Sequence, residues 1–325
     1  MRLRPEGEGN QGGQNVSDIK LFRFSKNGAQ ELPGKTAALE KKLHTLMEKN
    51  LECFLGIRLV AGEYSTGKNH HGRIDTLGLD ENGCPVILEY KRHTNENVIN
   101  QGLYYLDWLL DHRAEFKLLV LERYGKQAAS QLEWDGARVL CIAGEFTKFD
   151  LHAVAQIGRN IELIRYRFFS DDLILFELLT AQSSQQGAAK GSKGQPHAAP
   201  EGSAEEPAAK GSLARQIAGM SPDIANLWEE ILDSIRGLGE DVNIRFLRHY
   251  VACSRLKNFV CLHPLKSEIV LWLKLDPASI SLEQGFTQDV SNKGHLGTGN
   301  LEVRITNEAA LDKALPLISR AYEES

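Results

Sequence analysis

The sequence predicts an α/β protein of two folded units: an N-terminal mixed sheet flanked by helices, and a separate C-terminal α+β unit. Its 325 residues exceed the usual size of a single domain. Residues 182–212 hold 20 Ala, Gly, Ser or Pro in 31 positions and no Val, Ile, Leu, Met, Phe, Trp or Tyr. Such a segment cannot bury a core. We therefore expect a flexible linker there, folded units at residues 17–181 and 213–325, and a disordered tail at residues 1–16.

Apolar periodicity gives the order of elements within each unit. In the first unit, strands are predicted at residues 19–24, 58–64, 72–79 and 85–91, and helices at residues 37–54 and from an N-cap at Asn95 to about His112. Strand-like runs follow at residues 116–122, 138–144, 161–169 and 172–179, with helices between the first three. The second unit is predicted to have helices near 213–236 and 241–256, strands at 259–264, 268–275 and 301–305, and a closing helix from Asn307.

Composition and charge exclude several classes of protein. An apolar fraction of 42% with 25% charged residues is ordinary for a soluble globular protein. A net charge of -5 argues against a generally basic nucleic-acid coat or an electrostatic membrane binder, although it leaves room for a local basic groove. The five cysteines form no CxxC pair and leave one over, so neither a zinc ribbon nor a disulfide framework is indicated. This use of cysteine fits a reducing cytoplasm. With no apolar run long enough to span a bilayer, we also expect no membrane partner.

Three charged residues lie near the middle of a predicted hairpin, GRIDTLGLDENGCPVILEYKR, rather than at its tips. Alternate side chains of a strand share a face, so Glu89 and Lys91 project together, and the short turn can bring Asp75 alongside Glu89. Crowded carboxylates are costly unless a cation joins them, and magnesium takes oxygen ligands of this kind. The hairpin therefore favours a metal site, while a solvent-facing hairpin with cross-strand ion pairs remains the alternative.

A fourth acid belongs to the first helix. On a helical wheel Glu40 falls inside the apolar stripe, whereas Glu48 and Glu52 fall outside it and are interpreted as ordinary solvated acids. A carboxylate inside the stripe needs a buried partner, which water on a metal ion or Lys91 can provide. The other interpretation of Glu40 is an acid favoured by the helix dipole.

A polar pair follows on the next helix. Gln101 and Tyr105 are one turn apart, at the edge of that helix's apolar stripe, and can face the same cleft as the hairpin charges. A polar pair at a helix boundary explains them equally when they are taken alone.

Together these residues resemble, in their order along the chain, the signature of the PD-(D/E)XK nuclease superfamily: Glu40, Asp75 in GRID, Glu89 and Lys91 in ILEYK, and Gln101 and Tyr105 in QGLYY. More narrowly they resemble the NucS-like and RecB-like endonucleases, whose core is a helix, a β-meander with D…ExK, and a helix bearing QxxxY. The resemblance covers residues 19–181, is best between 37 and 110, and implies a restriction-endonuclease-like fold.

That resemblance implies a metal-dependent endonuclease that hydrolyses phosphodiester bonds in nucleic acid, with DNA expected, in repair or defence. The implied cofactor is Mg²⁺ or Mn²⁺. Asp75, Glu89 and the backbone carbonyl of Tyr90 would be metal ligands, and Glu40 would bind or orient a metal ion or its water.

The remaining matched residues would act on the substrate. Lys91 would activate the attacking water or stabilise the charge of the phosphorane, as a compact point charge can. Gln101 and Tyr105 would position the nucleic acid.

One motif beside the site is a decoy. GEYSTGKN, residues 62–69, nearly matches the phosphate-binding GxxxxGK[ST] loop, but Asn69 replaces the magnesium-binding hydroxyl and a strand rather than a helix follows. Lys68, His71 and Arg73 are interpreted instead, together with His70, as a basic rim in which Arg73 helps to position nucleic acid, although loop solvation also explains these residues.

The resemblance has limits. The N-terminal dimerisation module of NucS has no room in this chain, so mismatch specificity is not inherited. The C-terminal unit resembles an uncharacterised family, found beside such nuclease cores, that has been labelled a predicted transport protein, and nothing membrane-like in the sequence supports that label. A homodimer and an unknown protein partner held by the C-terminal unit are both left open.

Three functional hypotheses follow. The first is the metal-dependent nuclease with an accessory domain. The second is a nuclease-like fold that binds nucleic acid or protein without cutting, against which the intact set of Asp75, Glu89 and Lys91 argues. The third makes the C-terminal unit the working part and the first unit a scaffold.

Overall fold

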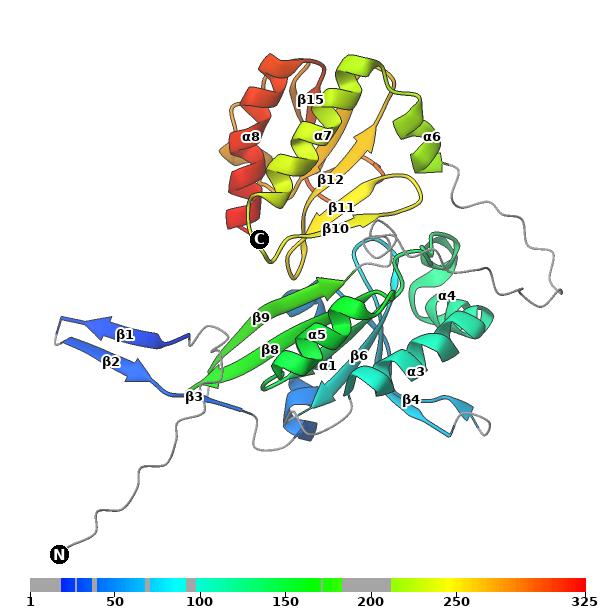
Figure 1. The fold of residues 1–325 in the computed structure, drawn as a ribbon, viewed down its shortest axis with the longest axis vertical. Coiled ribbons are helices and arrows are strands. Elements are labelled where there is room, and N and C mark those ends of the chain that lie inside the picture. The colour runs from blue at the N-terminus through cyan, green and yellow to red at the C-terminus, as the bar shows by residue number, and fades with distance from the viewer. Residues whose placement is uncertain are drawn as a thin grey trace, which may run out of the picture.

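The computed structural model describes residues 19–26, 28–36, 40–67, 71–91, 98–170, 172–182 and 212–325 (Figure 1). These residues form two large sheets, each with its own helices, and a two-stranded hairpin that projects from the N-terminal unit. The predicted tail, almost all of the predicted linker and the Asn95 cap lie outside the described residues and stay predictions. None of the described helices is long and apolar enough to cross a membrane.

A seven-stranded mixed sheet forms the N-terminal unit, in the order β3-β8-β7-β6-β5-β4, with β9 also pairing with β8. Its strands are β3 (Gly34–Lys35), β4 (Arg58–Ser65), β5 (Arg73–Leu79), β6 (Pro85–Lys91), β7 (Arg138–Ala143), β8 (Ile161–Phe169) and β9 (Leu173–Gln182). The central strands β6, β7 and β8 run parallel, and the remaining pairs are antiparallel. The predicted mixed sheet is confirmed, as is the hairpin of β5 and β6.

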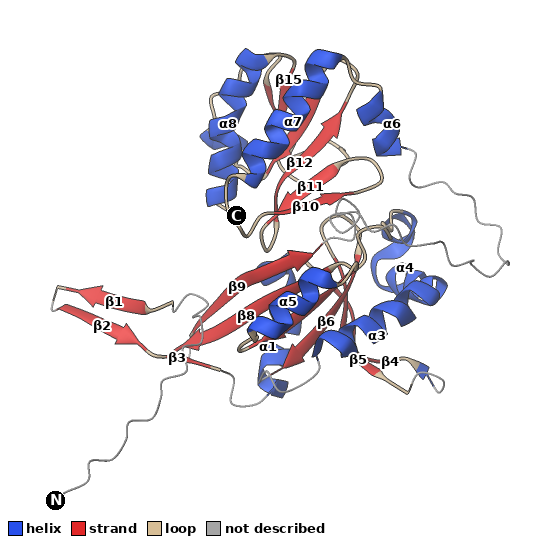
Figure 2. Ribbon diagram, in the orientation of Figure 1, coloured by secondary structure: helices blue, strands red, loops and turns tan. Residues whose placement is uncertain are grey.

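Helices cover both faces of this sheet (Figure 2). On one face, α1 (Glu40–Leu55) packs its buried Leu43 and Met47 against side chains of β6 that include Leu88 and Tyr90. On the other face, a second core gathers Ile87 of β6 with residues of α3 (Val98–Asp111), α4 (Arg113–Ser130) and α5 (Lys148–Gln156). Because β6 is covered on both faces, all its residues except Lys91 are buried.

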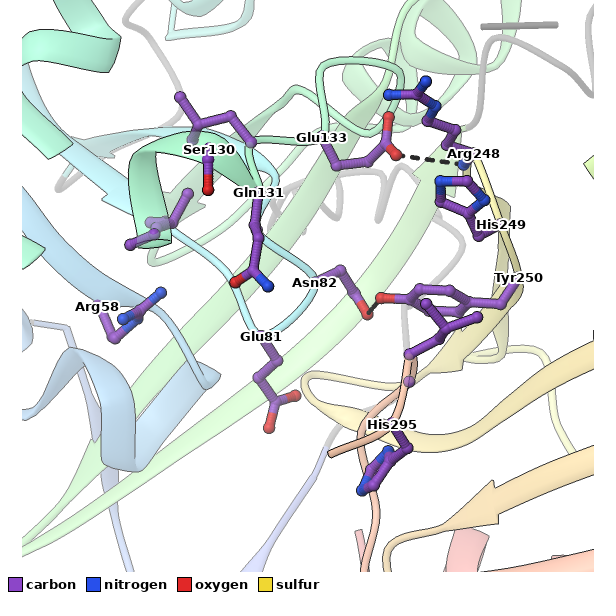
Figure 3. Close-up of a pocket in the computed structure, with 16 residues that line it drawn as sticks. Arg58, Glu81, Asn82, Ser130, Gln131, Glu133, Arg248, His249, Tyr250 and His295 are labelled. Carbon is purple, nitrogen blue, oxygen red and sulfur yellow. Dashed lines mark hydrogen bonds between the residues drawn. The ribbon is translucent and has the colours of Figure 1, made fainter. Parts of the chain in front are cut away.

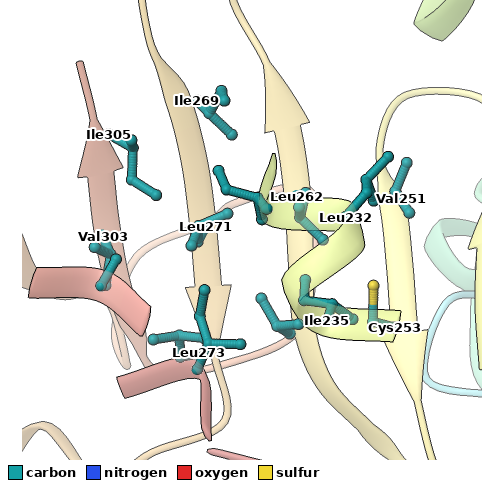
Figure 4. Close-up of a cluster of buried hydrophobic side chains, with 14 of the residues drawn as sticks. Leu232, Ile235, Val251, Cys253, Leu262, Ile269, Leu271, Leu273, Val303 and Ile305 are labelled. Carbon is teal, nitrogen blue, oxygen red and sulfur yellow. The ribbon is translucent and has the colours of Figure 1, made fainter. Parts of the chain in front are cut away.

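The C-terminal unit is a six-stranded antiparallel sheet of order β10-β11-β12-β13-β15-β14. Its strands are β10 (Asn243–Phe246), β11 (Val251–Ser254), β12 (Asn258–Pro264), β13 (Ile269–Leu273), β14 (Thr287–Asp289) and β15 (Leu301–Ile305). The helices α7 (Pro222–Arg236) and α8 (Glu308–Glu323) lie together on one face, and α6 (Ser212–Ala218) precedes them. Figure 4 shows the core between that face and the helices, where Leu232 and Ile235 of α7 meet Leu262 and Leu271.

Two predicted elements are wrong. Residues 116–122, predicted as a strand, belong to α4: Phe116 and Val120 are buried at helical spacing, and the apolar residues between them are half-exposed. Residues 241–256, predicted as a helix, form the hairpin of β10 and β11. That hairpin is covered on both faces, so polar Asn243 and Arg245 are buried beside apolar neighbours and the alternation that marks a strand is hidden.

A buried network of charges joins the two units. Arg138, the first residue of β7, forms ion pairs with Asp80 and with Glu162, the latter at 2.9 Å. From the C-terminal unit, Arg245 Nη1 lies 3.2 Å from Asp80 Oδ2, and Asn243 Nδ2 donates to Glu162 Oε1 at 3.0 Å. All five side chains are buried, so each of the four charged groups needs its partners to offset the cost of removing it from water. The C-terminal unit is thereby held against the edge of the first sheet where β6, β7 and β8 begin.

Candidate active site

Asp75 and Glu89 face each other across the hairpin of β5 and β6. The register pairs Thr76 with Leu88, which sets Asp75 opposite Glu89. The backbone N–H of Asp75 donates to Glu89 Oε1 at 3.3 Å, and the backbone N–H of Tyr90 donates to Asp75 Oδ2 at 3.0 Å. Each carboxylate is thus fixed by the backbone of the partner strand, and the two lie side by side as the sequence predicts.

Glu89 is the more unusual of the two. It is fully buried, and its Oε2 has no hydrogen-bond partner among the described residues. Burial, and next the charge of Asp75, raise the pKa of Glu89 to about 9, even though the charge of Lys91 lowers it. An ordinary buried carboxylate has its oxygens satisfied by donors. Without a bound cation, Glu89 therefore keeps its proton at neutral pH, because its neighbours do not neutralise a second negative charge beside Asp75.

Lys91 is the last residue of β6, next to the sheet edge where the parallel strands end. It is only partly buried and stands level with Ala143 of β7. Its ammonium is close enough to Glu89 to lower the pKa of that carboxyl. Asp75, Glu89 and Lys91 therefore converge at one end of β6.

Glu40 is the first residue of α1, but its side chain is not among those described. The turn of α1 that follows it places Leu43 in the core on the face of β6 opposite Glu89. The proposed contact of Glu40 with a metal ion, or with Lys91, stays a prediction.

Gln101 and Tyr105 are joined to the start of β5. The hydroxyl of Tyr105 accepts hydrogen bonds from the backbone N–H of Arg73 at 3.1 Å and from Gln101 Nε2 at 3.4 Å. Gly72 makes this approach possible, since a Cβ there would lie 2.5 Å from the Tyr105 ring. The ring is almost fully buried. Its contacts indicate that Tyr105 ties α3 to the strand carrying Asp75, before any contact with a ligand.

The residues of the predicted basic rim lie at the surface or outside the described residues. The side chain of Arg73 is exposed, and its ion pair with Glu63 spans 3.7 Å. Lys68 and His70 are not described, and His71 is exposed, so the rim stays a prediction. The near-match to a phosphate-binding loop is followed by strand β5.

The sequence reasoning missed a polar cluster on the other face of β5. His44 Nε2 lies 3.2 Å from both the carbonyl oxygen of Asp75 and Thr76 Oγ1, and 3.1 Å from Glu48 Oε1. Thr76 also donates to Glu48 Oε1 at 3.3 Å. Glu48 is therefore not the solvated acid that the helical wheel indicates. The i, i+4 spacing of His44 and Glu48 was the available signal, and the cluster fixes the strand directly behind Asp75.

The donor set suits a hard divalent cation. Asp75 and Glu89 offer oxygen ligands at one point, and the unpartnered Glu89 Oε2 is the kind of buried atom that a cation satisfies. Within the described ranges, no group of three or more His, Cys, Asp or Glu side chains is arranged to hold a metal ion. A complete ligand set thus needs backbone carbonyl or water oxygens, or a side chain that is not described, such as that of Glu40.

A separate cavity of about 440 Å³ lies between the two units (Figure 3), and neither Asp75 nor Glu89 lines it. Glu81, Asn82 and Glu133 of the first unit line it opposite Arg248 and Tyr250 of the second. Tyr250 donates to Asn82 Oδ1 at 3.1 Å, and the backbone N–H of Arg248 donates to Glu133 Oε2 at 3.2 Å. These contacts extend the junction formed by the buried charge network.

Comparison with known proteins gives a match for the C-terminal unit. Residues 214–325 match the family model described as "Domain of unknown function (DUF5655)". An uncharacterized protein of Haemophilus influenzae is 26% identical over 320 residues, which cover 94% of this chain and 100% of that protein. Neither the description of the family nor the name of the Haemophilus influenzae protein states an activity.

Two solved structures show weak similarity. One is described as "Structure of EndoMS-dsDNA2 complex", with 21% identity, a TM-score of 0.24 and coverage of 40% of this chain and 47% of that chain. The other is a crystal structure of a repair endonuclease from Pyrococcus abyssi, with 17% identity, a TM-score of 0.27 and coverage of 48% and 70%. This chain thus spans about half the length of the first structure, and at these TM-scores neither likeness establishes a shared fold.

Proposed function

We propose that this protein is a metal-dependent endonuclease that hydrolyses phosphodiester bonds, with DNA as its substrate, and that its core is of the PD-(D/E)XK type. The observation that carries the proposal is the buried Glu89 beside the half-buried Asp75, with Lys91 on the same strand as Glu89. The burial of Glu89, and next the charge of Asp75, raise the pKa of Glu89 to about 9, which costs stability at neutral pH. A purely structural role does not offset that loss of stability, whereas binding of a cation does.

Asp75 and Glu89 would hold the metal ion, with the Tyr90 carbonyl and Glu40 as further oxygen ligands. When bound there, magnesium or manganese would supply a lowered pKa for a water molecule and would neutralise phosphodiester oxygens. The residues of the chain orient that chemistry: the backbone N–H groups of Asp75 and Tyr90 fix both carboxylates before any ligand arrives.

Lys91 would contact the scissile phosphate. It stands at the end of β6, where the strand leaves the buried sheet, and its ammonium lies within electrostatic reach of Glu89. A fixed ammonium at that point would stabilise the negative charge that builds on the phosphate oxygens during displacement. Tyr105 and Gln101 would act indirectly, by holding the start of β5, the strand that carries Asp75, against α3.

The alternative is a module of the same fold that binds nucleic acid without cutting it. Phosphate binding alone needs positive charge. Asp75 and Glu89 oppose it, and a binding module would gain stability by losing them. Hydrolysis explains the two carboxylates and the lysine together, so we favour the enzyme.

The test is a cleavage assay on labelled single-stranded, duplex, branched and mismatched DNA and on RNA, each with magnesium, manganese or EDTA. We expect cutting of at least one DNA substrate that needs the metal and stops in EDTA. Binding of these substrates without cutting under any metal would instead establish the non-cleaving module.

A further inference from the structure

The hairpin of β1 (Leu21–Ser25) and β2 (Gly28–Leu32) is unusually exposed. Every residue of the two strands is exposed except Leu32. Phe24 is 85% exposed and Phe22 52%. In β1 these two rings are separated by one residue, so they share one face of the ribbon. An isolated two-stranded hairpin is marginally stable in water, and two exposed aromatic rings on one face form an apolar surface that a partner can cover.

The hairpin is attached to the catalytic end of the sheet. It leads directly into β3, whose Lys35 pairs with Phe168 near the end of β8. One strand position away, the last residue of β7, Ala143, pairs with Lys91 on one side and with Arg165 on the other. β3 therefore pairs with β8 beyond the point where β7 ends. It lies about three residues, or 10 Å, further along the sheet than Lys91, and one strand spacing of about 5 Å from the line of β6.

Opposite ends of the sheet thus carry different attachments. The buried network of Asp80 and Arg138 holds the C-terminal unit where the parallel strands begin. The hairpin projects from the other end, where β8 ends (Figure 1), and Lys91 is the last residue of the parallel strand β6. The hairpin is therefore within reach of the next few monomers of a polymer that is bound at Asp75 and Glu89.

The charge of the ribbon fits such a polymer. Residues 19–35 contain four basic side chains and one acid, in a chain whose net charge is -5. The acid, Glu31, lies 3.6 Å from Lys20, which leaves the basic side chains of Arg23, Lys26 and Lys35 in excess. Aromatic rings on which bases stack, interleaved with cations that contact phosphates, are the usual means of gripping single-stranded nucleic acid.

We propose that the β1–β2 hairpin grips single-stranded nucleic acid next to the proposed cleavage site, with Phe22 and Phe24 stacking on unpaired bases and Lys26, in the turn that follows β1, contacting phosphates. The inference rests on the proposed function for its placement of the substrate. It narrows the substrate to nucleic acid with an unpaired segment, because bases within a duplex do not present their faces. Lysine-rich surfaces are disfavoured in protein interfaces, so a second copy of this chain is the weaker occupant.

The experiment measures binding of the full-length protein to a fluorescein-labelled single strand and to a duplex by anisotropy, in EDTA. The double variant Phe22→Ala with Phe24→Ala should bind the single strand at least about tenfold more weakly, and the duplex with less change. Phe22→Tyr with Phe24→Tyr should restore binding, because the rings still stack. The matched control is Leu118→Ala with Leu121→Ala, which removes two exposed apolar side chains of α4 and should bind like the wild type.

Charge gives a second, independent variant. Lys26→Gln should weaken binding and should also make the logarithm of affinity fall less steeply with the logarithm of salt concentration, by about 0.7 for the one lost phosphate contact. This readout does not depend on the rings.

The outcomes separate the two proposals. Equal single-strand binding by wild type and both hairpin variants, with metal-dependent cutting intact, would overturn the hairpin inference alone. Loss of binding in the hairpin variants, with no cutting by the wild type under any metal, would support the hairpin and overturn the nuclease. Dissociation of a wild-type oligomer by the double alanine variant, with unchanged binding, would assign the rings to self-association and overturn the inference.

Discussion

The backbone N–H of Asp75 donates to Glu89 Oε1 across the β5–β6 ladder at 3.3 Å. This places the two carboxylates on one face of a hairpin that is rigid because β6 is buried on both sides. Neither position depends on a long side chain reaching across solvent. The pair is therefore present in the fold before any ligand binds, and its electrostatic cost is measurable in the protein alone.

Glu89→Gln should stabilise the metal-free protein at neutral and alkaline pH. The folded-state pKa of about 9 lies above the ordinary 4.5, so the stability contributed by the proton on Glu89 is present below about pH 4.5 and is lost as the pH rises through 9. In that window each pH unit should remove up to about 1.4 kcal/mol from the wild type, whereas the glutamine does not ionise. Urea unfolding in EDTA between about pH 5 and pH 9 measures this.

The control is Glu122→Gln, an exposed acid on α4, which should follow the wild type at every pH. Parallel pH profiles for wild type and Glu89→Gln would show that Glu89 ionises normally and that the site is not strained.

Magnesium or manganese should raise the melting temperature of the wild type. A ligand that binds only the folded state contributes about 2.7 kcal/mol at a hundred times its Kd. Asp75→Asn and Glu89→Gln each remove a charged ligand, so their melting temperatures should respond much less, while Glu122→Gln responds fully. Thermal unfolding against metal concentration tests this, and an equal metal response in all four proteins would place the binding elsewhere.

Tyr105→Phe should destabilise the fold by about 1–3 kcal/mol, because it leaves the backbone N–H of Arg73 without its acceptor. Tyr104→Phe, on the exposed neighbour, should cost less than about 0.5 kcal/mol. Denaturant unfolding compares the two. An unchanged free energy of unfolding in Tyr105→Phe would mean that its hydroxyl does not clamp β5.

Arg245→Ala should destabilise the junction of the two units by about 3–5 kcal/mol, since it leaves the buried Asp80 with Arg138 as its remaining cation. We expect one cooperative unfolding transition in the wild type and two separate ones in the variant. Arg248→Ala is the matched control, because its side chain is exposed and its contact to Glu133 is made by the backbone. If Arg245→Ala unfolds in a single transition at the same position as the wild type, Arg245 does not stabilise the junction.

The same network should show in acid. Burial alone would raise the pKa of Asp80, but Arg138 and Arg245 hold it below the ordinary value of 3.8. A lowered carboxyl pKa contributes stability that is present above 3.8 and is lost as the pH falls through the folded-state value. Arg245→Ala should therefore lose stability at a higher pH than the wild type during acid titration followed by circular dichroism.

How much of this could be predicted from the sequence depends on the range of the contacts. The hairpin of Asp75 and Glu89 is local, since one short turn sets its register, and the strand period already aligns the charges. His44 and Glu48 meet Thr76 only when α1 docks on the sheet, and a helical wheel carries no information about the polar atoms of a facing strand. Such contacts are set by packing rather than by periodicity.

The junction was beyond prediction for the same reason. Asn243 and Arg245 are buried against the N-terminal unit, and their polarity hid a strand pair within a run that looks helical. The stretch at Phe116 failed in the opposite way, because β-branched and large apolar residues filled a helix of which only one side is buried. In both cases tertiary contacts outweigh local preference.

Cleavage by Lys91→Ala is the most direct test of the central claim. The wild type, Lys91→Ala and the exposed control Lys117→Ala are compared on the DNA that the wild type cuts, with magnesium and with EDTA. We expect magnesium-dependent cutting that falls at least about 100-fold in Lys91→Ala and is unchanged in Lys117→Ala, with both variants folded. Cutting by a folded Lys91→Ala at the wild-type rate, or wild-type cutting that persists in EDTA, would contradict an active site made by Asp75, Glu89 and Lys91.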